Sequence, residues 1–157
     1  MRLWVLPLLL VLGAALPVSA DQPIAYSHKQ HIALGLQCKD CHTNSDPGEM
    51  MGFPATAKCM ACHRTIKKDS VAIEKLAGFT SQNRPVPWVR IYQIPAYVSF
   101  SHRTHLETGA TCAQCHGPVA ERDVIRKETD ISMGGCMACH KAHKASLDCA
   151  YCHEPRQ

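Results

Sequence analysis

The sequence is poor in the large aliphatic and aromatic side chains from which protein cores are usually built. Beyond Ala20, Leu, Ile, Val and Phe together occupy only about a sixth of the positions. Chains with less than about 20% of these residues usually cannot bury enough apolar surface to fold. The composition therefore excludes an ordinary side-chain core. Either the chain is disordered, or something other than side chains fills its interior.

Long hydrophobic runs are also missing beyond the N-terminus. The apolar run at 3–16 follows Arg2 and precedes small residues at 18–20, which is the pattern of a secretion signal. A membrane-spanning helix needs about 20 apolar residues, so this run is short for that role. We therefore predict a signal peptide at 1–20, cleaved near its end, and a periplasmic mature chain that starts at Asp21. An uncleaved anchor is the alternative.

No cysteine of the chain lies outside a five-residue motif. The motif Cys-x-x-Cys-His occurs five times, as CKDCH, CMACH, CAQCH, CMACH and CAYCH. Its members are Cys38, Cys41 and His42; Cys59, Cys62 and His63; Cys112, Cys115 and His116; Cys136, Cys139 and His140; and Cys149, Cys152 and His153.

Three kinds of chemistry use paired cysteines. A disulfide framework suits an exported protein but gives no reason for the histidine after each second cysteine. Structural zinc sites combine Cys-x-x-Cys pairs in fours, and five pairs cannot be divided that way. Covalent haem attachment requires this motif, because two thiols bond the porphyrin edge while the adjoining histidine binds iron. The motifs therefore predict five covalently attached haem c groups.

Five haems also resolve the shortage of apolar side chains, because each porphyrin supplies large apolar faces. We therefore predict a single compact domain over 21–157, mostly irregular with short α-helices wrapped around the haems, and little or no β-sheet. By analogy with small domains that fold only around their metal, the haem-free chain is expected to be largely unfolded.

Five further histidines match the five predicted irons in number. They are His28, His31, His102, His105 and His143. This count predicts that every iron is bound by two histidines, one proximal and one distal. His143 stands alone near the fourth motif, and Met133 is the alternative sixth ligand there.

The other four histidines belong to an internal repeat. YSHKQHIALGLQCKDCH at 26–42 aligns without a gap with FSHRTHLETGATCAQCH at 100–116. Each copy is followed by a CMACH motif. The sequence thus predicts two-haem modules at 26–63 and 100–140, a connector at 64–99 and a fifth haem at 141–157.

Each repeat places its two extra histidines three positions apart, on one side of a short helix, where they can serve neighbouring irons. Close haem packing around each helix is therefore expected. Within the connector, the pattern at 64–79 predicts a helix with Gly78 as its stop. The prolines at 84–95 predict an extended segment.

Iron with both axial positions filled suits electron transfer, whereas reduction of a substrate generally needs an open position. The sequence therefore favours a carrier of single electrons over an enzyme, with redox proteins as partners. The alternatives are a reductase with one open iron, and a subunit of a conducting filament.

Without Arg2, the mature chain carries 16 Lys and Arg against 13 Asp and Glu. Ten haem propionates would bring its net charge to about −7, which argues against a nucleic-acid partner.

The motifs resemble those of class III cytochromes c, and most closely the pentahaem cytochrome subunit of alternative complex III, a quinol-oxidising respiratory assembly. The resemblance rests on YSHKQHIALGLQCKDCH, FPATAKCMACH, WVRIYQIPAYVSFSHRTHLETGATCAQCHGPV and SMGGCMACHK. It implies that His28 binds the haem on Cys38 and Cys41, and that His102 binds the haem on Cys112 and Cys115. His31 and His105 would each reach a different haem.

Overall fold

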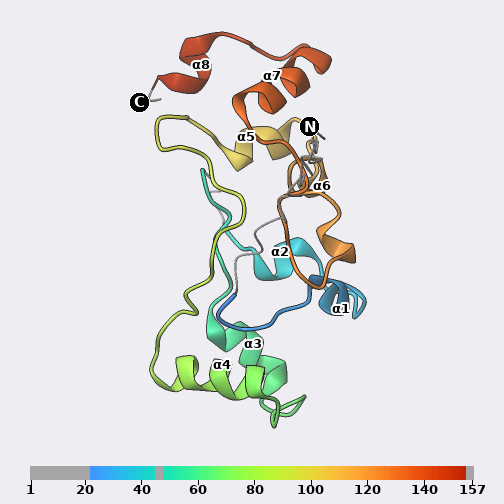
Figure 1. Cartoon of the computed structure of the whole chain (residues 1–157), viewed down its shortest axis with the longest axis vertical. Helices are drawn as coiled ribbons and strands as arrows, with labels where there is room; N and C mark the ends of the chain where they lie inside the picture. The colour runs from blue at the N-terminus through green and yellow to red at the C-terminus, as the bar shows by residue number, and fades with distance from the viewer. Residues whose placement is uncertain (1–21, 45–47, 155–157) are drawn as a thin grey trace, which may run out of the picture.

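The computed structural model describes residues 22–44 and 48–154. The predicted signal peptide and its cleavage point lie outside this part of the chain. The described residues form short helices spaced along an elongated molecule, with α4 near one end and α8 near the other (Figure 1). They contain no β-strand, so the predicted fold class is confirmed.

The helices follow the motifs closely. They are α1 (His28–Ile32), α2 (Cys38–Cys41), α3 (Thr56–His63), α4 (Val71–Ser81), α5 (His102–Glu107), α6 (Cys112–His116), the 3₁₀ turn η1 (Val119–Glu121), α7 (Met133–Ala142) and α8 (Cys149–His153). Among these described helices, none is long and apolar enough to cross a membrane.

Helix starts are encoded locally, and equivalent positions of the repeat use equivalent caps. Ser27 and Ser101 cap α1 and α5, each accepting a hydrogen bond from a backbone N–H three positions later. Gln37 and Thr111 begin capping boxes that start α2 and α6. The repeated serine therefore fixes where each pair of extra histidines enters its helix.

The predicted helix at 64–79 is partly wrong. Residues 64–70 form a turn in which Lys67 has a left-handed φ of 53°, and α4 begins only at Val71. Ser70 caps α4 by accepting from the Ile73 N–H at 3.3 Å. Gly78 does not stop the helix, because α4 continues past it to Ser81.

The side-chain core is very small. Ile24, Leu76 and Val86 are the buried hydrophobic residues of the described chain, and they cluster beside α3 and α4. Other large apolar side chains face solvent, among them Leu34, which is 79% exposed, and Val71, which is 81% exposed. This core matches the composition: side chains alone fill little of the interior.

The extended segment at 84–95 contains no helix and runs back along the long axis from α4 towards α5 (Figure 1). Val89 exchanges two hydrogen bonds with the side chain of Gln22, at 2.8 and 3.0 Å. Farther along, the Tyr92 hydroxyl lies 3.0 Å from the His116 carbonyl oxygen and accepts from the Glu128 N–H at 3.1 Å. The segment thereby ties the two halves of the chain together.

Candidate haem-binding sites

All five Cys-x-x-Cys-His motifs lie on helices or at their ends: α2, α3, α6, α7 and α8. Helical geometry places positions three apart on one side, so both cysteines of a motif face the same way. All ten cysteines are free thiols. The described residues also contain no group of three or more His, Cys, Asp or Glu side chains placed to hold a metal ion. Each motif thus presents its own two cysteines on one side of its helix, as covalent haem attachment requires.

The structure brings eight of the ten histidines together as four ring pairs. The pairs are His28 with His42 (ring centroids 6.4 Å apart), His102 with His116 (6.3 Å), His31 with His63 (6.1 Å) and His105 with His140 (6.1 Å). Each pair joins a histidine of α1 or α5 to the histidine of a Cys-x-x-Cys-His motif. The first histidine of each repeat lies against the motif just downstream, and the second lies against the following CMACH motif.

This spacing fits an iron held between two imidazoles. With a metal–nitrogen bond of about 2 Å and a ring centre about 1 Å beyond the nitrogen, two rings on opposite sides of one metal have centroids about 6 Å apart. Direct stacking of two aromatic rings can be closer, at about 4.5 Å. The residues present therefore fit haem iron at four of the motifs.

Backbone carbonyls orient most of these rings. The Nδ1 atoms of seven histidines lie within 3.4 Å of a carbonyl oxygen, with these partners: His31 and Ser27, His42 and Gly52, His63 and Ile66, His102 and Gly48, His105 and Ser101, His140 and Ser146, and His153 and Tyr97. A carbonyl only accepts, so Nδ1 carries the proton and Nε2 is left with a free lone pair. Metal-binding histidines are commonly oriented in this way.

The other two histidines of the ring pairs, His28 and His116, have no such carbonyl partner among the described residues, and both are half-buried. Burial, with the nearby rings of His42 and His31, lowers the pKa of His28 to about 4. Burial also lowers the pKa of His116, with His102 and His42 adding to the effect. Both rings are therefore neutral near pH 7, which is the form that binds a metal.

An aromatic residue supports the extra histidines in each repeat, and the sequence alone did not assign it a role. The Tyr26 ring stacks on His31 (4.4 Å, 20° between planes) and meets His28 edge-on at 4.8 Å. Phe100 makes the equivalent contacts with His105 and His102, both at 4.8 Å. The signal was present, because an aromatic residue stands two positions before the first histidine in both copies of the repeat.

The fifth motif differs from the other four. Its His153 ring lies 6.0 Å from the ring of Tyr97, at 25° between planes, and forms no ring contact with a histidine in the described chain. His143, the predicted partner, caps the C-terminal end of α7, is exposed, and takes part in none of the four ring pairs. Met133, at the start of α7, is 66% exposed.

Neighbouring motifs approach each other in a definite order. Burial raises the pKa of four thiols, and thiols of other motifs add to the effect in each case: Cys41 beside Cys59, Cys112 beside Cys38, Cys139 beside Cys115, and both Cys115 and Cys152 beside Cys136. The helices α3, α2, α6 and α7 follow in that order along the long axis, and α8 lies beside α7 at the same end of the molecule (Figure 1). In space the sites thus run 59–63, 38–42, 112–116, 136–140 and 149–153, which differs from their order in the sequence.

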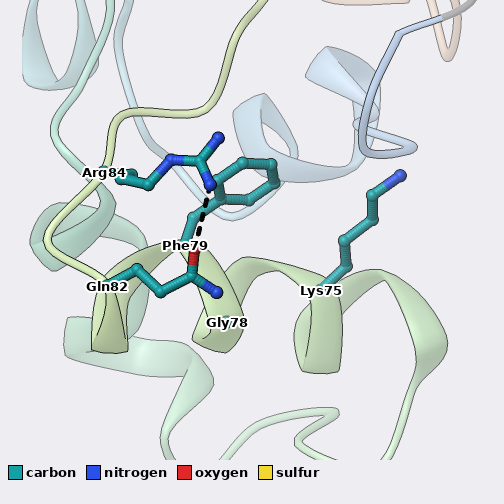
Figure 2. Close-up of a pocket in the computed structure, with 5 residues that line it drawn as sticks. All are labelled: Lys75, Gly78, Phe79, Gln82 and Arg84. Carbon is teal, nitrogen blue, oxygen red and sulfur yellow. Dashed lines mark hydrogen bonds between the residues drawn. The ribbon is translucent and has the colours of Figure 1, made fainter.

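One pocket lies apart from these sites, on α4 (Figure 2). It has a volume of about 350 Å³ and is lined by Lys75, Gly78, Phe79, Gln82 and Arg84. The Arg84 guanidinium lies over the Phe79 ring at 5.8 Å and donates to the Gln82 side-chain oxygen at 3.0 Å. No histidine or cysteine lines the pocket, so it forms no part of the haem-binding sites.

Comparison with known proteins agrees with this geometry. The family described as cytochrome c3 matches residues 30–117, more than half of the chain, and the family described as cytochrome c7 and related cytochrome c matches 98–154. The multihaem cytochrome c subunit of menaquinone reductase from Nitratidesulfovibrio vulgaris is 36% identical over 98 residues. The match covers 61% of this chain and 46% of the relative, so the chain spans about half the length of that protein.

The motifs, the ring pairs and the family matches lead to one conclusion. Haem-attachment motifs recur along the chain, and histidine pairs are spaced for iron beside four of them. The chain belongs to the cytochrome c3 family of multihaem cytochromes, and it is an electron-transfer protein with covalently bound c-type haems.

Proposed function

We propose that this chain carries five haems and is the electron-transfer subunit of a periplasmic respiratory complex that exchanges electrons with quinone. The observation that carries the electron-transfer part is the set of four histidine pairs with centroids 6.1 to 6.4 Å apart. The link to quinone is supported by the relative's name, menaquinone reductase, and by the resemblance to the pentahaem subunit of alternative complex III.

In this proposal the ten cysteines attach the haems, and the five motif histidines bind iron from the proximal side. His28, His31, His102 and His105 are the distal ligands of four irons. When bound, the haem groups take up and release single electrons. The chain's own residues hold these groups at fixed positions, orient the imidazoles through backbone carbonyls and keep other iron ligands out. The two ends of the row of sites, at 59–63 and 149–153, are where partner proteins would exchange electrons.

Whether the fifth iron has a distal ligand distinguishes an electron carrier from a reductase. We keep His143 as its proposed distal ligand, which requires the exposed ring to turn towards the 149–153 site. The second candidate function, a reductase with one open iron, is favoured by the absence of a histidine ring beside His153 in the described chain. Carbon monoxide binding distinguishes the two functions, because carbon monoxide needs a ferrous iron with a free or weakly held position.

The experiment uses the mature holoprotein. Five covalent haems by mass spectrometry, and no carbon monoxide bound by the reduced protein, are the expected results for a carrier in which His143 is a ligand. Binding of one carbon monoxide per protein in the native form would favour the reductase. Fewer than five haems would contradict the proposed cofactor content.

The link to a quinone-reactive complex is tested separately. The tagged full-length chain, expressed in its own cells and extracted from membranes with mild detergent, is expected to purify with membrane-spanning subunits. Its haems should be reduced by added menaquinol, or, once reduced, should be reoxidised by menaquinone. Recovery of the chain alone from the osmotic-shock fraction, with no reaction towards either quinone form, would refute this part of the proposal. Whichever fraction contains the chain, a mature N-terminus at Asp21 would support signal cleavage and export to the periplasm.

A further inference from the structure

One short segment touches axial histidines of two different sites. Residues 48–52 follow the first motif in the sequence. The Gly52 carbonyl oxygen accepts from Nδ1 of His42 at 2.8 Å. The Gly48 carbonyl oxygen accepts from Nδ1 of His102 at 3.1 Å and from its backbone N–H at 2.8 Å. The segment therefore contacts one histidine of the 38–42 site and one of the 112–116 site, which we call the inner sites.

Among the described residues, these two glycine carbonyls are the ones that accept from the imidazoles of the inner sites. The remaining histidine of the 38–42 site, His28, has a buried Nδ1 atom with no hydrogen-bond partner in the described chain. The remaining histidine of the 112–116 site, His116, contacts Tyr92 edge-on at 4.7 Å. Each inner pair thus has one ring anchored by a carbonyl, and both anchors come from residues 48–52.

The sites at 59–63 and 136–140, which we call the outer sites, are anchored differently. Their four histidines use carbonyls that lie close by along the chain: Ser27 for His31, Ile66 for His63, Ser101 for His105 and Ser146 for His140. Gly48, in contrast, lies 54 residues from His102. A change at 48–52 should therefore reach the inner sites and leave the outer anchors intact.

The ring planes separate the same two groups. The imidazoles are nearly parallel at the inner sites, at 5° and 3° between planes. They are steeply inclined at the outer sites, at 61° and 49°. The energies of the iron d orbitals depend on whether two axial imidazoles are parallel or crossed. Ferric inner and outer irons should therefore give distinct electron paramagnetic resonance signals.

We propose that residues 48–52 are a shared positioning segment that sets the reduction potentials of both inner irons together. An imidazole that donates its Nδ1–H to a carbonyl is a stronger electron donor to the metal. Stronger donation stabilises ferric iron and lowers the potential. This inference rests on the proposed binding of one iron by two histidines at each inner site.

Two features hold the segment in place. Gly52 has a φ of +83°, a conformation that residues with a Cβ rarely adopt. The Asn44 side-chain amide donates to the Met50 carbonyl oxygen at 2.9 Å, in the middle of the segment. Substitution at either position should move the two glycine carbonyls without removing a haem ligand or a cysteine.

The test is a redox titration of the holoprotein followed by electron paramagnetic resonance, on Asn44→Ala and Gly52→Ala. Gln93→Ala is the control for Asn44, because Gln93 also donates its amide to a backbone carbonyl, that of Arg90, at 3.1 Å. Gly109→Ala is the control for Gly52, because it has a φ of +88° and open space around it.

We expect both test variants to shift the two irons with near-parallel ligands to higher potential, with the crossed-ligand irons unchanged and both controls like the native protein. A change in reduction potential at one iron alone, at all irons, or equally in the controls would overturn the proposal that residues 48–52 position both inner sites. If Gly52→Ala does not fold, Asn44→Ala decides alone. Native protein that shows no low-spin signal of two histidine ligands would instead reject the proposed function on which the inference rests.

Discussion

His31→Ala provides a sharp test of the paired histidines, because the affected iron should belong to the second motif along the chain and not to the first. His31 lies shortly before Cys38 in the sequence, yet its ring faces His63, with centroids 6.1 Å apart. Its Nδ1 is bound to the Ser27 carbonyl at 2.7 Å, and Tyr26 stacks on its face. The ring of His28 is already opposed to His42, so it is not free to replace His31.

The expected magnitude follows from counting irons. Removing one distal imidazole exposes one of the five proposed irons. The reduced variant should therefore bind one carbon monoxide more per protein than the native form, which corresponds to about a fifth of its haem. A matching fraction of the oxidised protein should become high-spin. The neighbouring substitution Lys29→Ala, on the same helix, should leave both values at the native level.

The location of the opened iron is found by removing its haem. In the variant that combines His31→Ala with Cys59→Ala and Cys62→Ala, the additional carbon monoxide binding should disappear along with one haem in the mass spectrum. His28→Ala combined with the same two cysteine changes should keep its additional binding, because its iron lies at the 38–42 site. Retention of binding in the first combination would refute the assignment of His31 to the 59–63 site.

Two further predictions concern stability. Leu76 is 4% exposed in the small cluster beside α3 and α4. Leu76→Ala should therefore lower the free energy of unfolding by about 2–5 kcal/mol in a denaturant titration, with haem spectra unchanged before unfolding. A loss below about 0.5 kcal/mol would mean that the cluster contributes little. Burial, with the nearby Cys41 and Cys59 thiols, raises the pKa of Tyr26 from 10.0 to about 12. The stability that Tyr26 contributes through this shift is complete below pH 10 and is lost as the pH rises towards 12. Tyr26→Phe should therefore make Tm fall less steeply with pH over that range. A plot of Tm against pH parallel to that of the native protein would count against a buried phenol.

Much of the architecture could be predicted from the sequence because haem attachment imposes a local motif. The Cys-x-x-Cys-His pattern marks the proposed haem sites, and the gapless repeat of 26–42 at 100–116 shows which histidines are equivalent. The scarcity of apolar side chains predicted the short helices and the small core. The serine that caps α1 and α5 was visible as a repeated residue, although its role became clear only from the structure.

Other features could not be predicted, either because the local backbone departs from the sequence pattern or because the contacts join distant segments. The start of α4 is set by the backbone at Lys67 and the cap at Ser70, against a sequence pattern that looked helical from residue 64. Gly48 and Gly52 contribute backbone carbonyls, which every residue has, so the sequence gives no sign that they bind the imidazoles of His102 and His42. The spatial order of the sites depends on how the chain returns along the connector.

The contact between Cys38 and Cys112 has a consequence for the origin of the molecule. These residues are equivalent in the two repeats, as are His42 and His116, and the ring of His42 lies close enough to lower the pKa of His116. The Lys29 N–H of the first repeat donates to the Arg122 carbonyl of the second, while the His102 N–H of the second donates to the Gly48 carbonyl of the first. Contacts between equivalent residues are the mark of a twofold axis, as in a symmetric homodimer. A single ancestral module with this surface would pair with its own copy, and gene duplication with fusion would then yield the present chain.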